Sequence, residues 1–149
     1  MEQPIRPNTR AIITELERRS KANCEAVNNR DFSPATSALY RGKSSKWTAQ
    51  ASIGSTVHNL DEHVHSIQRV CNEYPDFRIR VVDMHTTVND KADFAELYVN
   101  TESSNAPPGV SRPSVSIVVY RLIRGEWLSV HHMSLAGLPA EGSSQVSLI

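Results

Sequence analysis

The chain has 149 residues, 39% of them apolar, and its 16 Lys and Arg balance its 16 Asp and Glu, so the formal net charge is zero. This length fits one domain with a real hydrophobic core. The charge balance removes the electrostatic reason to expect nucleic acid or an anionic membrane as a partner. No stretch approaches the ~18 apolar residues of a membrane span, and the N-terminus lacks the apolar core of a secretory signal. Cys24 and Cys71 fall in expected helices and indicate buried thiols. We therefore expect a soluble cytoplasmic domain.

The N-terminal half is expected to be mainly helical. Residues 1–8 form a polar, proline-containing arm, and a helix follows over residues 9–29, with Thr9 as its N-cap and apolar residues at helical spacing. Residues 35–40 fit a short second helix that stops before Gly42. Trp47, Ala49 and Ala51 then alternate with polar residues, which predicts a short strand.

A third helix is predicted over residues 59–74. Asn59 and Glu62 have the spacing of a capping box, and an apolar stripe follows at helical period. Pro75 ends the helix.

The remaining chain predicts strands over residues 77–89, 91–102, 114–124 and 126–135. Asn89-Asp90 and Arg124-Gly125 have the composition of compact hairpin turns, and residues 103–113 form a longer loop. The domain is expected to span residues 9–137, with a flexible tail over 138–149. This order is typical of an α+β fold. A strongly curved, mostly antiparallel sheet packed on three N-terminal helices leaves a cone whose open end is a natural ligand site.

Three segments in this order resemble the NTF2-like superfamily, and within it the SnoaL-like group. They are AVNNRDFSPATSALY, HVHSIQRVCNEYPDFRIRVVDM and VVYRLIRGEWLSVHHMSL. The resemblance implies a cone-shaped α+β barrel, usually a homodimer, with a cofactor-free pocket for a hydrophobic small molecule. Catalytic relatives include polyketide cyclases, ketosteroid isomerases and scytalone dehydratase, and a small fungal subset acts on meroterpenoids. The superfamily also contains members without enzymatic activity, so the resemblance does not establish catalysis.

His132, on the last predicted strand, is the main candidate for catalysis. It shares a face with Leu128 and Val130 because strand side chains alternate, and His131 is expected to face the other way with Trp127 and Ser129. The resemblance implies that the residue near His132 points into the pocket, where related hydrolases carry an acid. A buried imidazole can move a proton between carbon atoms of a substrate. The structural alternative is a core histidine bonded to a neighbouring element.

Tyrosines and acids on the other strands are further candidates. The Tyr120 phenol could donate to a substrate carbonyl or simply pack its ring in the core. Glu96 and Tyr98 share one face, which is either the pocket or the solvent side. Asp83 and His85 are also a same-face pair, which either orients the imidazole in the pocket or is solvated.

The remaining candidates are expected near the pocket mouth. Arg41 precedes a polar loop and could bind a substrate carboxylate or carbonyl, or remain solvated. Trp47 fits a flat apolar wall or a core position, and His58 lies just before the third helix. Glu62 is either the capping glutamate alone or also a second proton carrier.

A metal site is not expected. His63 and His65 are two residues apart on a helix, which is not the i, i+4 spacing of a zinc pair, and no cysteine cluster is present. The sequence also lacks a phosphate-binding glycine loop and a Gly-X-Ser-X-Gly motif.

The leading hypothesis is a cofactor-independent isomerase or cyclase of a polycyclic natural product, such as a polyketide or meroterpenoid. His132 is its acid–base group, Tyr120 and Arg41 are hydrogen-bond donors, and Glu62 or Asp83 is the second proton carrier. One alternative is a scytalone-type dehydratase built on Asp83 and His85. The other is a non-catalytic ligand-binding or dimerisation module.

Overall fold

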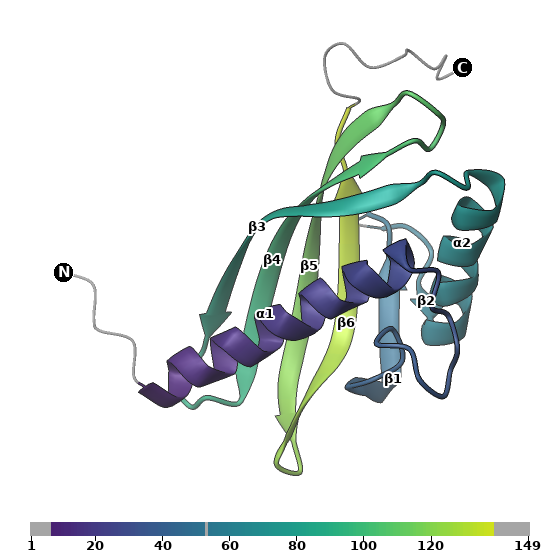
Figure 1. Cartoon of the computed structure of the whole chain (residues 1–149). Coiled ribbons are helices and arrows are strands. Elements are labelled where there is room, and N and C mark those ends of the chain that lie inside the picture. Colours follow the sequence, from purple (N-terminus) through teal and green to yellow (C-terminus); the bar gives the residue numbers. More distant parts are fainter. Residues whose placement is uncertain (1–6, 53, 139–149) are drawn as a thin grey trace.

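The computed structural model describes residues 7–52 and 54–138 and shows an α+β fold with one six-stranded sheet (Figure 1). The sheet order is β2-β1-β6-β5-β4-β3, with β1 and β6 parallel and all other neighbours antiparallel. The expected arm, apart from residues 7 and 8, and the expected tail beyond Leu138 lie outside the described residues. In chain order the elements are α1 (Pro7–Asn28), β1 (Lys43–Gln50), β2 (His58–Asn59), α2 (Leu60–Glu73), β3 (Arg78–Val88), β4 (Phe94–Ser104), β5 (Ser111–Ile123) and β6 (Glu126–Ala136).

Helix α1 crosses the concave face of the sheet, and α2 lies beside β1 and β2 (Figure 1). Thr9 lies inside α1, so its prediction as the N-cap is wrong; the helix already begins at Pro7, a residue type that the first turn tolerates because its N–H is not needed there. At the other end, the Asn28 side chain exchanges two hydrogen bonds of 2.8 Å with the backbone of Ile79. These bonds fix the end of α1 to the start of β3.

The predicted short helix over residues 35–40 is absent, so the described part of the chain has two helices rather than three. Turns replace it. The Ser37 hydroxyl donates to the Asp31 carbonyl oxygen at 2.7 Å and accepts from the Leu39 amide at 3.1 Å. Side-chain bonds of this kind offer the backbone an alternative to the helical ladder.

Helix α2 begins as predicted. Asn59 is its N-cap and accepts from the Glu62 amide at 2.9 Å, while the Glu62 carboxylate accepts from the Asn59 amide at 3.0 Å. The capping box is confirmed.

The four long strands lie where the sequence predicts them, with differences at their ends. Arg124 and Gly125 both have positive φ, 52° and 82°, as a tight hairpin turn requires. The other expected two-residue turn is wider: Asn89 is followed by a loop to Asp93, and its side-chain oxygen accepts from the Asp93 and Phe94 amides. The expected loop over 103–113 is shorter, because β4 continues to Ser104 and β5 starts at Ser111.

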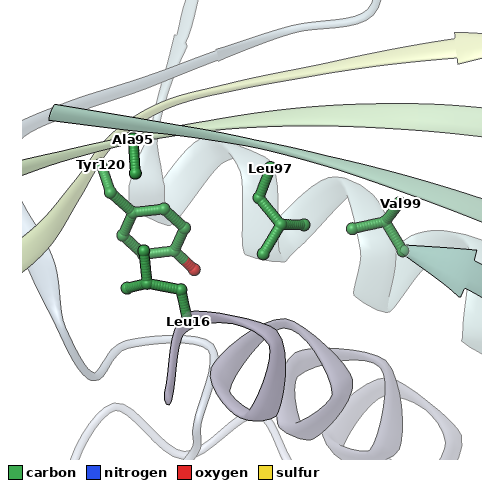
Figure 2. Close-up of a cluster of buried hydrophobic side chains, with 5 residues drawn as sticks. All are labelled: Leu16, Ala95, Leu97, Val99 and Tyr120. Carbon is green, nitrogen blue, oxygen red and sulfur yellow. The ribbon is translucent and has the colours of Figure 1, made fainter. Parts of the chain in front are cut away.

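The core lies between α1 and the concave face of the sheet. Figure 2 shows its centre, where the Tyr120 ring lies between Leu16 of α1 and Ala95 of β4, next to Leu97 and Val99. Each of these five side chains is at most 3% exposed. A second cluster, which joins α1 and α2, includes Val27, Leu39, Val64 and Cys71.

Two extra residues change which side chains face inward. In β3, Val81 pairs with Thr101 and Asp83 pairs with Asn100, so Val82 is the inserted residue and is 52% exposed. In β6, His131 pairs with Val119 and Ser129 pairs with Tyr120, so Val130 is inserted. Such bulges interrupt the simple alternation of a strand. The expectation that Trp127 and Ser129 face outward with His131 is therefore wrong: Ser129 is 2% exposed and Trp127 packs on the core.

Candidate functional site

His132 lies on the concave face, where three aromatic rings from three elements meet. It is on β6, between Ala49 of β1 and Val118 of β5. Its ring centroid is 5.2 Å from that of His63 on α2, at an interplanar angle of 88°. The Trp47 ring of β1 lies 5.2 Å from His63 and 6.3 Å from His132. We call His132, His63 and Trp47 the aromatic cluster.

Trp47 is fixed in this cluster by burial and by one hydrogen bond. It is 4% exposed, and its Nε1 donates to the Ser129 hydroxyl at 2.9 Å. Its indole therefore forms a rigid wall beside both imidazoles.

Both imidazoles are held in the neutral form at neutral pH. Burial lowers the pKa of His132 to about 3, with further lowering from His63 and Lys43. Burial also lowers the pKa of His63 to about 4, with Lys43 and His58 adding to the effect. Burial removes water from the charged imidazolium, and the site does not replace the lost solvation. Each ring therefore keeps an unprotonated nitrogen at neutral pH, and protonating one ring disfavours protonating the other.

Lys43, at the start of β1, supplies positive charge close enough to affect both histidines. Its Nζ donates to the Asn23 side-chain oxygen at 3.3 Å and to the Arg41 carbonyl oxygen at 3.4 Å. Both partners are neutral, so no carboxylate balances the ammonium within the described ranges. Burial, with Arg19 nearby, lowers its pKa to about 8.

Tyr120 faces inward but does not join the aromatic cluster. It is 2% exposed, and its hydroxyl lies 3.4 Å from that of Ser20 on α1. Burial raises its pKa. The structural reading of Tyr120 as a packed core residue fits this environment better than a role as substrate donor.

The candidates expected at the mouth are exposed or engaged elsewhere. Glu62, with 57% of its side chain exposed, caps α2, and an oxygen of its carboxylate lies 3.6 Å from Nδ1 of His58. The bond from the Asn59 backbone lowers the Glu62 pKa. Arg41 is exposed and donates to the Thr36 carbonyl oxygen at 2.7 Å. Glu62 is thus placed as a cap and not as a second proton carrier beside His132.

The four candidates on β3 and β4 lie on the outer face of the sheet. Ala95, Leu97 and Val99 pack inward, so the alternate residues Glu96 and Tyr98 point away from the core. Asp83 and His85 are exposed, and Asp83 accepts from the Asn100 side chain at 2.6 Å. Of the two alternatives for each pair, the pocket position is wrong, and the position away from the core agrees with the structure.

His63 and Lys43 are the site residues that the sequence interpretation missed. His63 falls on the apolar stripe of α2, three residues after Leu60 and four before Ile67. A histidine on the buried stripe of an amphipathic helix was the available signal. Lys43 carried no comparable signal, because its side chain contacts Asn23 of α1, 20 positions away in the sequence.

Within the described residues no group of three or more His, Cys, Asp or Glu could hold a metal ion. Two surface hollows lie away from the aromatic cluster. One of about 590 Å³ is at the β3–β4 hairpin, beside Phe94 and Arg121, and one of about 450 Å³ is beside Arg30 and Phe77. Both are open to solvent and neither is lined by a histidine, so the aromatic cluster is the better candidate site.

Neither helix in the described part of the chain has the length and apolar character needed to cross a membrane. No protein-family model matches the sequence, and no curated protein matches it.

Solved structures match over almost the whole chain at low identity. An NTF2-like protein of unknown function from Pseudomonas putida KT2440 has a TM-score of 0.68 and 14% identity, covering 93% of this chain and 96% of that one. Hexachlorocyclohexane dehydrochlorinase LinA-type3 from Novosphingobium barchaimii LL02 has a TM-score of 0.71 and 11% identity, with 92% and 95% covered. The association domain of C. elegans CaMKII has a TM-score of 0.63 and 13% identity, with 87% and 98% covered. The chain thus has the curved α+β fold of NTF2-like proteins.

Proposed function

We propose that this chain is a cofactor-independent isomerase or lyase that moves protons on carbon through His132. The observation that carries the proposal is the edge-to-face contact of His132 with His63, 5.2 Å apart on the concave face. Two neutral imidazoles beside a half-buried lysine form a set that can both accept and return a proton. The dehydrochlorinase with the same fold is a catalytic precedent for this architecture.

The chemistry follows from these charges. A neutral imidazole removes a proton from the carbon beside a carbonyl, and the C–H electron pair forms the C=C bond of an enolate. The Lys43 ammonium stabilises the enolate oxygen. Returning the proton to a different carbon gives an isomer. Loss of a leaving group from the next carbon, with its bonding electrons, gives an elimination.

We propose a polycyclic natural product, such as a polyketide or meroterpenoid, as the substrate. The flat apolar Trp47 indole supports this choice because it packs beside both imidazoles and makes the surroundings of His132 apolar and aromatic. In a cyclase, the enolate carbon bonds to the carbon of a second substrate carbonyl, the C=O π electrons pass to its oxygen, and that oxygen takes the proton held by the imidazole.

The scytalone-type alternative loses its specific support, because Asp83 and His85 lie on the outer face. A dehydration would instead have to use His132 and His63. The non-catalytic alternative is supported by the packed centre of the core around Tyr120, and an association domain has the same fold.

The test is conversion of a polycyclic β,γ-unsaturated ketone to its conjugated isomer, followed by ultraviolet absorbance. We expect turnover by the wild-type chain and its loss in His132→Gln and His63→Gln. His65→Gln, an exposed histidine on the same helix, is the matched control and should retain turnover. Unchanged turnover in His132→Gln would refute the mechanism, and binding without conversion in the wild type would favour the non-catalytic module.

We further propose that the chain forms a homodimer through the outer face of the sheet. Apolar side chains of the two central strands point outward there and are only half-buried, among them Ile117, Val119, Met133 and Leu135. Tyr98 adds a side chain that is 37% exposed. A second copy of this face would cover them.

A further inference from the structure

Arg112, near the start of β5, carries a polar atom that has lost water without gaining a partner. Its Nε is buried and has no hydrogen-bond partner, and the guanidinium makes no ion pair within the described ranges. Burying an unpaired donor costs free energy, and nearly all such groups in native proteins are satisfied. The arrangement is understandable if a ligand supplies the missing acceptor.

The strand register places Arg112 on the same face as His132. Arg112 pairs with Ser103, and two residues later Ser114 bonds to the buried Thr101 hydroxyl at 2.7 Å. With no irregularity between them, alternation puts Arg112 and Ser114 on one face. The same row continues through Ser116 to Val118, which is the partner of His132.

The surface between Arg112 and His132 is rich in hydroxyl groups and partly open to solvent. Ser114 and Ser116 on β5 and Ser134 on β6 all face inward and are only half-buried. From Val118 to Arg112 the strand advances six residues, or about 20 Å. A ligand that touches both ends therefore has an extended body, with oxygen atoms that can meet these hydroxyls.

We propose that Arg112 binds a carboxylate at one end of the substrate, so that the substrate is an acid carried on an oxygenated ring system. The planar guanidinium fork matches a carboxylate in geometry and charge. The nearest acid in the register, Glu102, faces outward and pairs with Arg80 at 3.5 Å, so it does not compete. The substrate assignment rests on the proposed reaction at His132, whereas the anion site is tested by binding alone.

The experiment measures the affinities of 2-naphthoate and its uncharged amide, 2-naphthamide, by isothermal titration calorimetry. For the wild-type chain we expect the acid to bind about tenfold or more tightly than the amide. In Arg112→Gln this ratio should fall close to one, with the amide affinity changed less than about twofold. Arg121→Gln is the matched control, because Arg121 is on the same strand and its guanidinium lies over the Phe94 ring. This variant should keep the wild-type ratio of acid to amide affinity.

Equal affinity of the wild type for acid and amide, or an unchanged ratio in Arg112→Gln, would overturn the proposal. If Arg112→Gln does not fold, Arg112→Lys carries the test: it keeps the charge without the fork, and the ratio should fall at least about threefold. An unchanged ratio in Arg112→Lys then counts against the site. His132→Gln should keep the wild-type preference for the acid over the amide. The anion site is therefore tested separately from the proposed catalysis, which the turnover of His132→Gln tests.

Discussion

The imidazole of His63 meets that of His132 edge to face, with the ring centroids 5.2 Å apart and the planes at 88°. The two residues come from α2 and β6, and 68 positions separate them in the sequence. Because both rings are also close to Lys43, protonating either one is opposed by its neighbour and by the lysine. The three groups together predict at which pH values the site should lose activity.

We predict a broad plateau in the pH profile of kcat/KM. The imidazoles act as bases when neutral, so activity should fall only as the pH drops towards about 4, the higher of the two histidine pKa values. Lys43 acts when charged, so activity should fall as the pH rises through about 8. The measurement is kcat/KM for the ketone isomerisation between pH 3.5 and 10. Lys43→Met should lower the plateau and remove the alkaline limb, and a histidine limb near pH 6.5 would contradict the assignment.

The same burial predicts lower stability in mild acid. His132 has a lower pKa in the folded chain, about 3, than in the unfolded chain, about 6.5. The unfolded state therefore binds more protons below pH 6.5, and the free energy of unfolding should decrease as the pH falls. Between pH 7 and pH 5 the loss from this residue is at most about 2 kcal/mol. Urea unfolding at both values measures it, and His132→Gln should show a smaller decrease than the wild type.

Two substitutions of Tyr120 test whether this residue acts in core packing or in catalysis. Its hydroxyl is 3.4 Å from Ser20, longer than a good O–H···O bond, so Tyr120→Phe should change the free energy of unfolding by less than about 1 kcal/mol. Tyr120→Ala should cost about 3–5 kcal/mol, because it leaves a cavity between Leu16 and Ala95. Chemical denaturation checks both values. A large fall in kcat with normal stability in Tyr120→Phe would show that the phenol acts on the substrate.

The sequence predicts local features of this fold better than the directions of its side chains. The capping box of α2 and the Arg124-Gly125 turn depend on neighbouring residues, so both could be predicted. The inward position of Ser129 depends on the bulge at Val130, which adds a residue only relative to the partner strand. Strand alternation within one segment cannot reveal such an insertion. His132 was identified from its strand and the family resemblance. His63 was missed although its place on the buried stripe of α2 was a local signal, because the contact between the two rings joins a helix and a strand far apart in the sequence.

Glu62 should prove structural. Its carboxylate accepts from the Asn59 amide at 3.0 Å, and its side chain is mostly exposed. Glu62→Gln keeps an acceptor at this position, so turnover and stability should stay near wild type. Asn59→Ala removes the other half of the box and should lower the free energy of unfolding by about 1 kcal/mol. Denaturation and the isomerisation assay measure the two effects, and a loss of turnover in Glu62→Gln at normal stability would restore Glu62 as a proton carrier.

The outer face of the sheet gives the last prediction, on assembly. Ile117 lies on the central strand β5, opposite Met133 of β6 and Tyr98 of β4, and all three side chains point away from the core. In a dimer formed through this face, the ammonium of Ile117→Lys would be buried without a partner. Removing this charge from water costs free energy on dimerisation. Light scattering coupled to size exclusion should therefore show a dimer for the wild type and a monomer for Ile117→Lys. Arg69→Glu, at an exposed position of α2 on the concave side, is the control and should remain dimeric. Because α1 and the aromatic cluster lie on the opposite face, the monomeric variant should keep its helical circular dichroism. A wild-type chain that is monomeric at all concentrations, or an Ile117→Lys variant that remains dimeric, would show that a second copy does not cover this face.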